Sequence, residues 1–123
     1  MYDKCEALLR EILKIERGDR CQICGRTADN IGLFHILPKG SHSKLRLYKA
    51  NLLLACWLPC HSTWHHEYKK AKHIEKRIKE ICGENYEEEL LKLEAMVPKQ
   101  GLVYLSMIHA GLKQELEDLR NRV

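Results

Sequence analysis

The fold is decided by the stretch that begins Cys21-Gln22-Ile23-Cys24 and closes with Cys56-Trp57-Leu58-Pro59-Cys60-His61. Two or three residues between thiols let both sulfurs of a pair reach one tetrahedral ion, and Gly25 supplies the left-handed backbone that such a turn needs. Four thiolates complete the coordination shell of zinc and leave no open position, so the predicted site is structural. The alternative, four unrelated core cysteines, is disfavoured by the two spacings together.

Length and composition predict one small domain. The chain has 123 residues, of which 45% are hydrophobic and 31% charged, which is typical of a globular protein. With a thin core, zinc would help, because a structural site contributes on the order of 10 kcal/mol to folding. We therefore expect a single α+β domain over 1–123, with an N-terminal helix in 1–19, a zinc-bound core in 20–82 and a C-terminal helical extension in 83–123.

Charge is unevenly distributed along the chain. The formal net charge of +4 permits a nucleic-acid partner without requiring one. Residues 30–66 contain no Asp or Glu, whereas acidic residues gather in 84–94. The region that carries the motifs is therefore predicted to be locally basic, through Lys39, Lys44, Arg46 and Lys49.

The N-terminal residues and the cysteines indicate the cellular setting. Residues 1–18 carry interspersed charges in place of a signal-peptide core, and no apolar run has the length needed to cross a bilayer. We expect a soluble, cytoplasmic protein with no membrane partner. In a reducing cytosol, paired cysteines favour metal binding over disulfides. Cys5 and Cys82 lie on apolar helical stripes, so we interpret them as small buried hydrophobes and not as reactive thiols.

Apolar periodicity predicts the helices, and a shorter pattern predicts a hairpin. Asp3 is a candidate cap for the first helix and Gly18 a candidate end. The predicted helices cover 3–17, 61–81, 86–95 and 102–120. The predicted β-hairpin has a strand at 31–37, a basic loop at 39–44 and a short returning strand at 45–48.

Three histidines lie close to the cysteines in the sequence. Imidazole titrates near neutrality, so His35 in the first strand is a candidate base. His61 and His65 are one helical turn apart and can hold a divalent ion together. Considered alone, each is more often a structural or surface residue, but their joint placement around a zinc site favours a catalytic centre. The remaining histidines have weaker claims: His42, His66, His73 and His109.

A family resemblance supports this interpretation. The matching pieces are the first cysteine pair, His35-Ile36-Leu37-Pro38-Lys39-Gly40, Leu45-Arg46, Asn51 and the closing run from Cys56 to His61 with Pro59 before its last cysteine. Together they resemble the His-Asn-His (HNH) nucleases of the ββα-metal fold, and more closely the NinG/Rap recombination proteins of lambdoid phages. The resemblance covers roughly residues 20 to 120.

The resemblance implies roles for individual residues. His35 would activate the water nucleophile, Asn51 would tie the hairpin together and orient that base, and His61 would hold the catalytic Mg²⁺ or Mn²⁺. Outside the resemblance, His65 is a candidate auxiliary ligand or phosphate contact, because it lies one helical turn from His61. One departure stands out, because many HNH enzymes have a second metal ligand immediately before the base, where this chain has Phe34. The bound ion would then rely on few protein ligands, on waters and on DNA phosphates.

The resulting expectation is a metal-dependent DNA endonuclease that acts on branched or otherwise distorted DNA, within a bacterial host cell if the chain is phage-encoded. Phosphates would be held by Lys39, Lys44, Arg46 and Lys49, with Arg46 as the clamp because its guanidinium fork suits phosphate. A second basic group, which a solvated helix face explains equally well, could extend this track: Lys69, Lys70, Lys72, Lys76 and Arg77.

Two other functions compete with this expectation. A zinc-stabilised module could keep the nuclease fold and bind DNA or protein without cutting, and Phe34 favours that alternative. A catalytic zinc hydrolase is weaker, because four thiolates close the zinc shell against substrate. A homodimer through the terminal amphipathic helices would give two active sites related by symmetry, which suits a branched DNA substrate.

Overall fold

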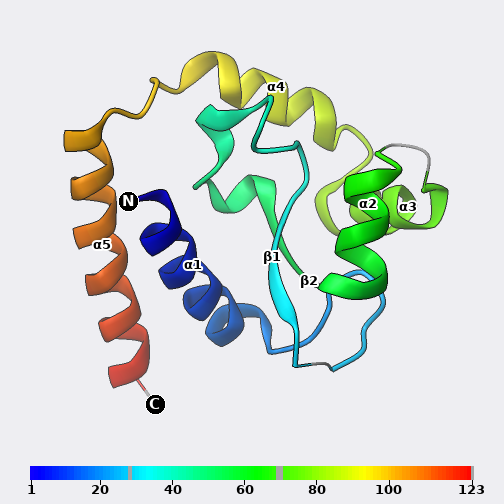
Figure 1. Ribbon diagram of the computed structural model, residues 1–123, viewed down its shortest axis with the longest axis horizontal. Helices are drawn as coiled ribbons and strands as arrows, with labels where there is room; N and C mark the ends of the chain where they lie inside the picture. Colours follow the sequence, from blue (N-terminus) through cyan, green and yellow to red (C-terminus); the bar gives the residue numbers. More distant parts are fainter. Residues whose placement is uncertain (28, 69–70, 123) are drawn as a thin grey trace.

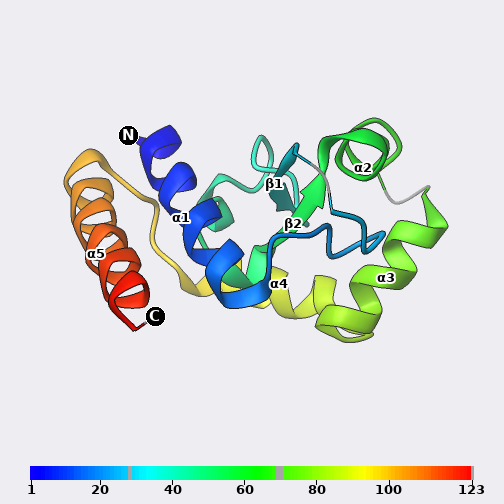
Figure 2. The ribbon, with the colours of Figure 1, turned by 90° about the horizontal axis from the view of Figure 1, so that it is seen from below.

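A computed structural model describes residues 1–27, 29–68 and 71–122, and it is a mixed helical and β structure. A small sheet occupies the middle of the molecule (Figure 1). Helices α1 and α5 lie side by side at one end, and α2 and α3 lie at the other, as the turned view also shows (Figure 2). The predicted α+β class is therefore confirmed in its coarse form.

Helix α1 (Tyr2–Arg17) packs along α5 (Leu102–Asn121). The contact is apolar on both sides, with Leu9 and Ile12 of α1 and Leu105 and Leu112 of α5 all buried. The predicted cap is wrong: Asp3 lies inside the first turn, and Met1 precedes the helix without a side-chain cap. Gly18 does end the helix, with a φ of 90° that favours glycine. The α4 helix (Tyr86–Met96) agrees with the predicted segment.

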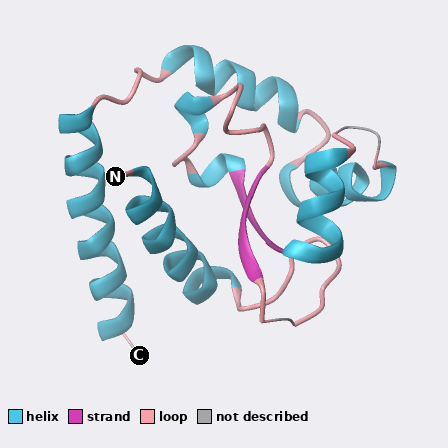
Figure 3. Cartoon of the chain, in the orientation of Figure 1, coloured by secondary structure: helices cyan, strands magenta, loops and turns pink. Residues whose placement is uncertain are grey.

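The sheet has two antiparallel strands, β1 (Ile31–His35) and β2 (Leu52–Cys56), paired from Ile31 opposite Cys56 to His35 opposite Leu52 (Figure 3). The predicted returning strand at 45–48 is wrong, because single helical turns at Ser43–Leu45 and Lys49–Asn51 occupy that part of the chain. All five residues of β2 are buried, so the strand reads as a continuous apolar run without the alternation expected of a half-exposed strand.

The predicted helix over 61–81 is two helices. A turn at Trp57–His61 leads into α2 (Ser62–His66), and α3 (Lys72–Cys82) follows. Their apolar stripe is shared, since Trp64, Ile74 and Ile78 are all buried. Periodicity therefore identified the buried face correctly but did not reveal the break at Glu67, whose φ of −121° and ψ of 45° are not helical. Lys69 and Lys70 lie outside the described residues.

Within the described parts of the chain, none of the helices combines the length and apolar character needed to cross a bilayer.

Candidate metal centre and histidine cavity

The four predicted cysteines meet at one point. Their Sγ atoms all lie within 4.8 Å of one another, and the Sγ atoms of Cys24 and Cys56 are 3.9 Å apart. A tetrahedral site with Zn–S bonds of about 2.3 Å has an S···S edge of about 3.8 Å, so the spacing fits zinc. The remaining members of this cysteine cluster, Cys21 and Cys60, are buried, and all four thiols are free. The cluster can hold a metal ion such as zinc.

Backbone contacts fix the first cysteine turn against the sheet. The Gly25 N–H donates to the Cys21 carbonyl (2.9 Å), and Gly25 has the positive φ of 79° that the sequence predicted. Gln22 bridges to β2 twice, because its N–H donates to the Leu54 carbonyl (2.7 Å) and its Oε1 accepts from the Leu54 N–H (2.8 Å). The sequence gave no signal for this bridge, since an isolated Gln has no characteristic spacing.

Burial and hydrogen bonds shift the pKa values of the clustered cysteines in opposite directions. Burial acts to raise the pKa of Cys24, but hydrogen bonds led by that from Arg26 Nε to Sγ (3.5 Å) lower it to about 6. Burial raises the pKa values of Cys56 and Cys60. Four adjacent thiols in such a setting resist full ionisation, and a bound dication would reverse that preference because thiolate is the ligand form.

The three histidines singled out from the sequence line one cavity. His35, His61 and His65 face a space of about 480 Å³ between β1, α1 and α2, beside the cysteine cluster. His35 comes from the end of β1, while His61 directly follows Cys60 and His65 lies one turn further on α2. The structure thus brings together the three histidines that the sequence singled out.

The hydrogen bond at His35 selects one tautomer. Its Nε2 lies 3.0 Å from the Arg46 carbonyl, which can only accept, so Nε2 carries the hydrogen and Nδ1 keeps its lone pair. Burial lowers the pKa of His35 below its ordinary value of 6.5, against the opposing effects of the Arg46 carbonyl and Glu6. A neutral imidazole with a free Nδ1 at neutral pH is the form that a general base requires.

His61 is held by aromatic neighbours. Its ring stacks on Trp57 at a centroid distance of 4.6 Å and lies 6.4 Å from the nearly parallel ring of His65. Its Nδ1 is buried and has no hydrogen-bond partner among the described residues. Burial, followed by the charges of His65 and His35, lowers the pKa of His61. A neutral ring with an unpartnered nitrogen fits a role as a ligand to a divalent ion.

Phe34 and Asn51 are core residues next to the cavity. Phe34 is 1% exposed and stacks on Trp64 at 5.9 Å, so it closes the cavity with an aromatic wall and offers no ligand atom. Asn51 is fully buried, and its amide bonds both backbone groups of Leu37: Oδ1 accepts from N–H (2.8 Å) and Nδ2 donates to the carbonyl (3.1 Å). Asn51 therefore fixes the segment that follows His35 to the start of β2.

The predicted basic residues are largely neutralised by acids from distant helices. Arg46 Nε donates to Glu6 (2.8 Å), and its guanidinium lies 4.4 Å from the centre of the Tyr2 ring. Lys49 pairs with Glu115 (2.6 Å) and Glu16 (3.2 Å). Lys39 stays half exposed, and the Lys44 carbonyl accepts from Gln100. Stretch 30–66 is basic in sequence, but the fold places carboxylates against it.

Glu6 is the cavity residue that sequence reasoning missed. It lies on α1, outside the cysteine and histidine motifs, yet it lines the cavity together with His35 and Lys39. The available signal was its place next to Cys5 on the buried stripe, because a charged residue at the edge of such a stripe meets the neighbouring element.

A comparison of the chain with known proteins gives no match to any family model, curated protein or solved structure. The functional interpretation therefore depends on the geometry of the cysteine cluster and the cavity beside it.

Proposed function

We propose that this protein is a metal-dependent endonuclease of the HNH type, which hydrolyses phosphodiester bonds in DNA. The observation that carries the proposal is the convergence of His35, His61 and His65 on one cavity beside four clustered thiols. The order of elements supports it, since an antiparallel strand pair followed by a helix is the arrangement expected of a ββα-metal core.

In this proposal the cysteine cluster holds Zn²⁺ and acts as a scaffold. Cys56 ends β2, and Cys60 directly precedes His61. A metal bound to both residues would fix the turn between them, and with it the place from which the His61 ring enters the cavity. The scaffold takes no part in the chemistry, because its four thiolates leave no open position for substrate.

His35 would act as the general base. The Nδ1 lone pair takes a proton from water, whose oxygen bonds to phosphorus while the phosphorus bond to the leaving sugar oxygen breaks. The hydrogen bond from Nε2 to the Arg46 carbonyl holds the ring in place during this transfer. Asn51 fixes the adjoining backbone through Leu37, so the base is preorganised before DNA arrives.

His61 and His65 would hold a divalent ion, Mg²⁺ or Mn²⁺. When bound, such an ion polarises the phosphate and stabilises the leaving oxygen. The neutral state of His61, favoured by its burial, keeps a ring nitrogen available as a ligand. With Phe34 in the adjoining wall, few protein ligands face the ion, so we expect weak metal binding in the absence of DNA. The preference for branched DNA belongs to the proposal on the strength of the family resemblance alone.

A binding module without nuclease activity is the second candidate. The observation that favours it is the complete burial of Phe34 in an aromatic stack, where many HNH enzymes have a metal ligand. In this alternative the cavity and its cations would still contact DNA, but no bound ion would be positioned to stabilise the leaving group.

A cleavage assay separates the two candidates. The protein is incubated with linear and four-way-junction DNA in Mg²⁺ or Mn²⁺, alongside His35→Ala and the control His73→Ala, which alters an exposed histidine on α3. We expect cutting by the unmodified protein and by His73→Ala, and DNA binding without cutting by His35→Ala. Absence of cutting with every ion and DNA form would favour the binding module.

A further inference from the structure

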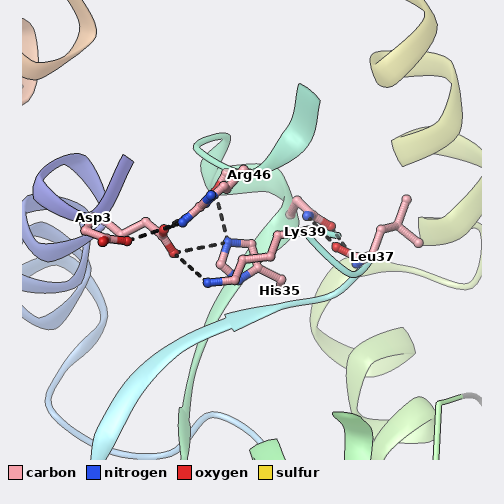
Figure 4. Close-up of polar contacts among 7 residues, drawn as sticks. Asp3, His35, Leu37, Lys39 and Arg46 are labelled. Carbon is pink, nitrogen blue, oxygen red and sulfur yellow. Dashed lines mark hydrogen bonds and ion pairs between the residues drawn. The ribbon is translucent and has the colours of Figure 1, made fainter. Parts of the chain in front are cut away.

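One carboxylate on α1, that of Glu6, lies between two cations and an imidazole at the cavity wall. Glu6 Oε1 accepts hydrogen bonds from Nε (2.8 Å) and from a terminal nitrogen of Arg46. Its other oxygen, Oε2, lies 3.7 Å from His35 Nε2 and 3.8 Å from Lys39 Nζ. Figure 4 shows Arg46, His35 and Lys39 converging on this point. Two of the predicted DNA-binding cations, Arg46 and Lys39, and the imidazole of His35 therefore surround a single acid from another part of the chain.

The carboxylate uses this site only in part. Arg46 is well bonded to Oε1, but the distances from Oε2 to His35 and Lys39 exceed those of hydrogen bonds. The Glu6 side chain is 14% exposed and that of Lys39 is 51% exposed, so the site opens toward solvent on the Lys39 side. A larger anion entering from there would find the Lys39 ammonium, a donor that Glu6 leaves unbonded, whereas the Nε2–H of His35 already donates to the Arg46 carbonyl.

The surrounding cations are chemically suited to a phosphate. A guanidinium fork matches the oxygens of a phosphate as well as those of a carboxylate, and a lysine on a flexible stem adds a point charge. The site also lies in the same cavity as His61 and His65. An anion bound here would therefore sit beside the proposed base and metal ligands.

We infer that Glu6 holds the place of a DNA backbone phosphate in a cradle formed by Arg46 and Lys39 beside His35, and that DNA binds by displacing this carboxylate. The inference rests on the proposed function in taking DNA as the ligand. It assigns to α1 a second role beyond packing, because the helix carries an internal competitor that weakens DNA binding until a phosphate replaces it.

The surroundings of Arg46 allow this exchange without dismantling the site. The Tyr2 ring stacks against the guanidinium, and Asp3 Oδ1 lies 3.4 Å from one of its nitrogens. The side chain of Asp3 is 98% exposed, so it competes weakly for that nitrogen. Tyr2 would hold the guanidinium in position after Glu6 departs, and the cradle would stay formed around the incoming phosphate.

Glu6→Gln tests the inference, because it keeps the shape of the side chain and removes its charge. Binding of a fluorescein-labelled four-way junction is measured by anisotropy, without added Mg²⁺ or Mn²⁺, over a series of salt concentrations. We expect Glu6→Gln to bind about fivefold or more tightly than the unmodified protein, and its salt dependence to increase by about one phosphate contact as Arg46 becomes free. The double variant Glu6→Gln/Arg46→Gln should lose this gain.

Glu16→Gln is the matched control, since it removes the same charge from the same helix. Its partner Lys49 stays held by Glu115 at 2.6 Å, so no cation is released and binding should change less than twofold. Equal tightening in both variants would reduce the effect to net charge and overturn the inference. Weaker binding by Glu6→Gln would also overturn the inference, and so would the finding that none of these proteins binds DNA.

Two further readouts keep the result interpretable. If Glu6→Gln fails to fold by circular dichroism, the Arg46 Nε–H signal of the unmodified ¹⁵N-labelled protein is followed during DNA titration. A shift that saturates with binding supports displacement of Glu6, and an unmoved signal contradicts it.

Cleavage is scored separately: tighter binding without cutting would keep the cradle and reject the nuclease. Cutting that falls in Glu6→Gln without tighter binding would keep the nuclease and make Glu6 a positioning residue for His35.

Discussion

The cysteine cluster and the histidine cavity are adjacent, yet they are built in different ways. The cluster consists of four like atoms within 4.8 Å, contributed by two short turns at the ends of one strand pair. The cavity joins groups of opposite charge from β1, α1, α2 and the connecting segment. Cys60 and His61 are neighbours in the chain but belong to the two different constructions.

This difference determines how each region responds to the substitution of a single residue. The cluster would depend on one shared metal ion, so loss of any thiolate weakens binding of that ion and with it the bond that holds the other three thiolates together. In the cavity each side chain has its own support, such as the Arg46 carbonyl for His35 and the aromatic stack for His61. We therefore expect all-or-none effects in the cluster and separable effects in the cavity.

The largest effect is expected from breaking the cluster. Cys60→Ser replaces a thiolate with a poor zinc ligand, and the loss can reach on the order of 10 kcal/mol, which is comparable to the whole free energy of unfolding of a small domain. Cys82→Ser is the control, because Cys82 is a partly buried cysteine outside the cluster. Metal analysis should find about one zinc per chain in the unmodified protein, and circular dichroism should show Cys60→Ser unfolded. A metal-free protein that is fully folded would contradict the zinc assignment.

If His35 is the proposed base, its removal should greatly slow DNA cleavage while sparing the fold. His35→Ala is expected to slow cleavage by about 10²–10⁴-fold, the usual contribution of general base catalysis. Its thermal unfolding should stay close to that of the unmodified protein, since the cluster and most of the core are untouched. A cleavage rate within about threefold of the unmodified protein would remove His35 from its proposed role.

A smaller effect is expected at Asn51, which supports the cavity by bonding the segment after His35. Asn51→Ala leaves the buried N–H and carbonyl of Leu37 without partners, which should lower the free energy of unfolding by about 2–4 kcal/mol. Asn85→Ala is the control, because Asn85 is exposed and makes no capping bond to α4. Urea unfolding measures both, and a cost at Asn51 no larger than that at Asn85 would argue against its supporting role.

The smallest expected effect is the pH dependence of activity and stability that arises from the cavity histidines. Burial lowers the pKa values of His35 and His61 below 6.5, so the acid limb of kcat/KM should have its midpoint below about pH 6.5. The unfolded chain binds more protons as pH falls through this range, so both histidines reduce stability on acidification and have no such effect well above pH 6.5. Urea unfolding of His35→Gln should show a weaker loss between pH 7.5 and 5.5. A kinetic midpoint above pH 7 would contradict the burial argument.

The cysteine cluster could be predicted because its spacings are local. A C-x2-C turn brings two thiols together by covalent geometry alone, and the same holds for Cys56 and Cys60. The apolar stripes of α1 and α5 followed from periodicity in the same way. The position of the returning strand could not be predicted in this way. The strand is β2, which is buried on both faces and lacks the alternation by which strands are recognised.

The electrostatics of the cavity could not be predicted from residues 30–66. That segment is free of acid in sequence, but α1 brings Glu6 to Arg46 and α5 brings Glu115 to Lys49. These pairs join residues 40 and 66 positions apart, a separation at which no sequence pattern specifies contact. The charge of the site therefore depends on how the helices pack.

By itself the sequence determined where a metal can bind and which histidines lie near it, since both follow from short spacings that covalent geometry converts directly into distance. Only the tertiary structure decided which groups face those histidines, because α1 reaches the cavity through packing against the rest of the core. It also decided that Phe34 closes the cavity wall and that Glu6 lies among the cations, both of which result from long-range burial.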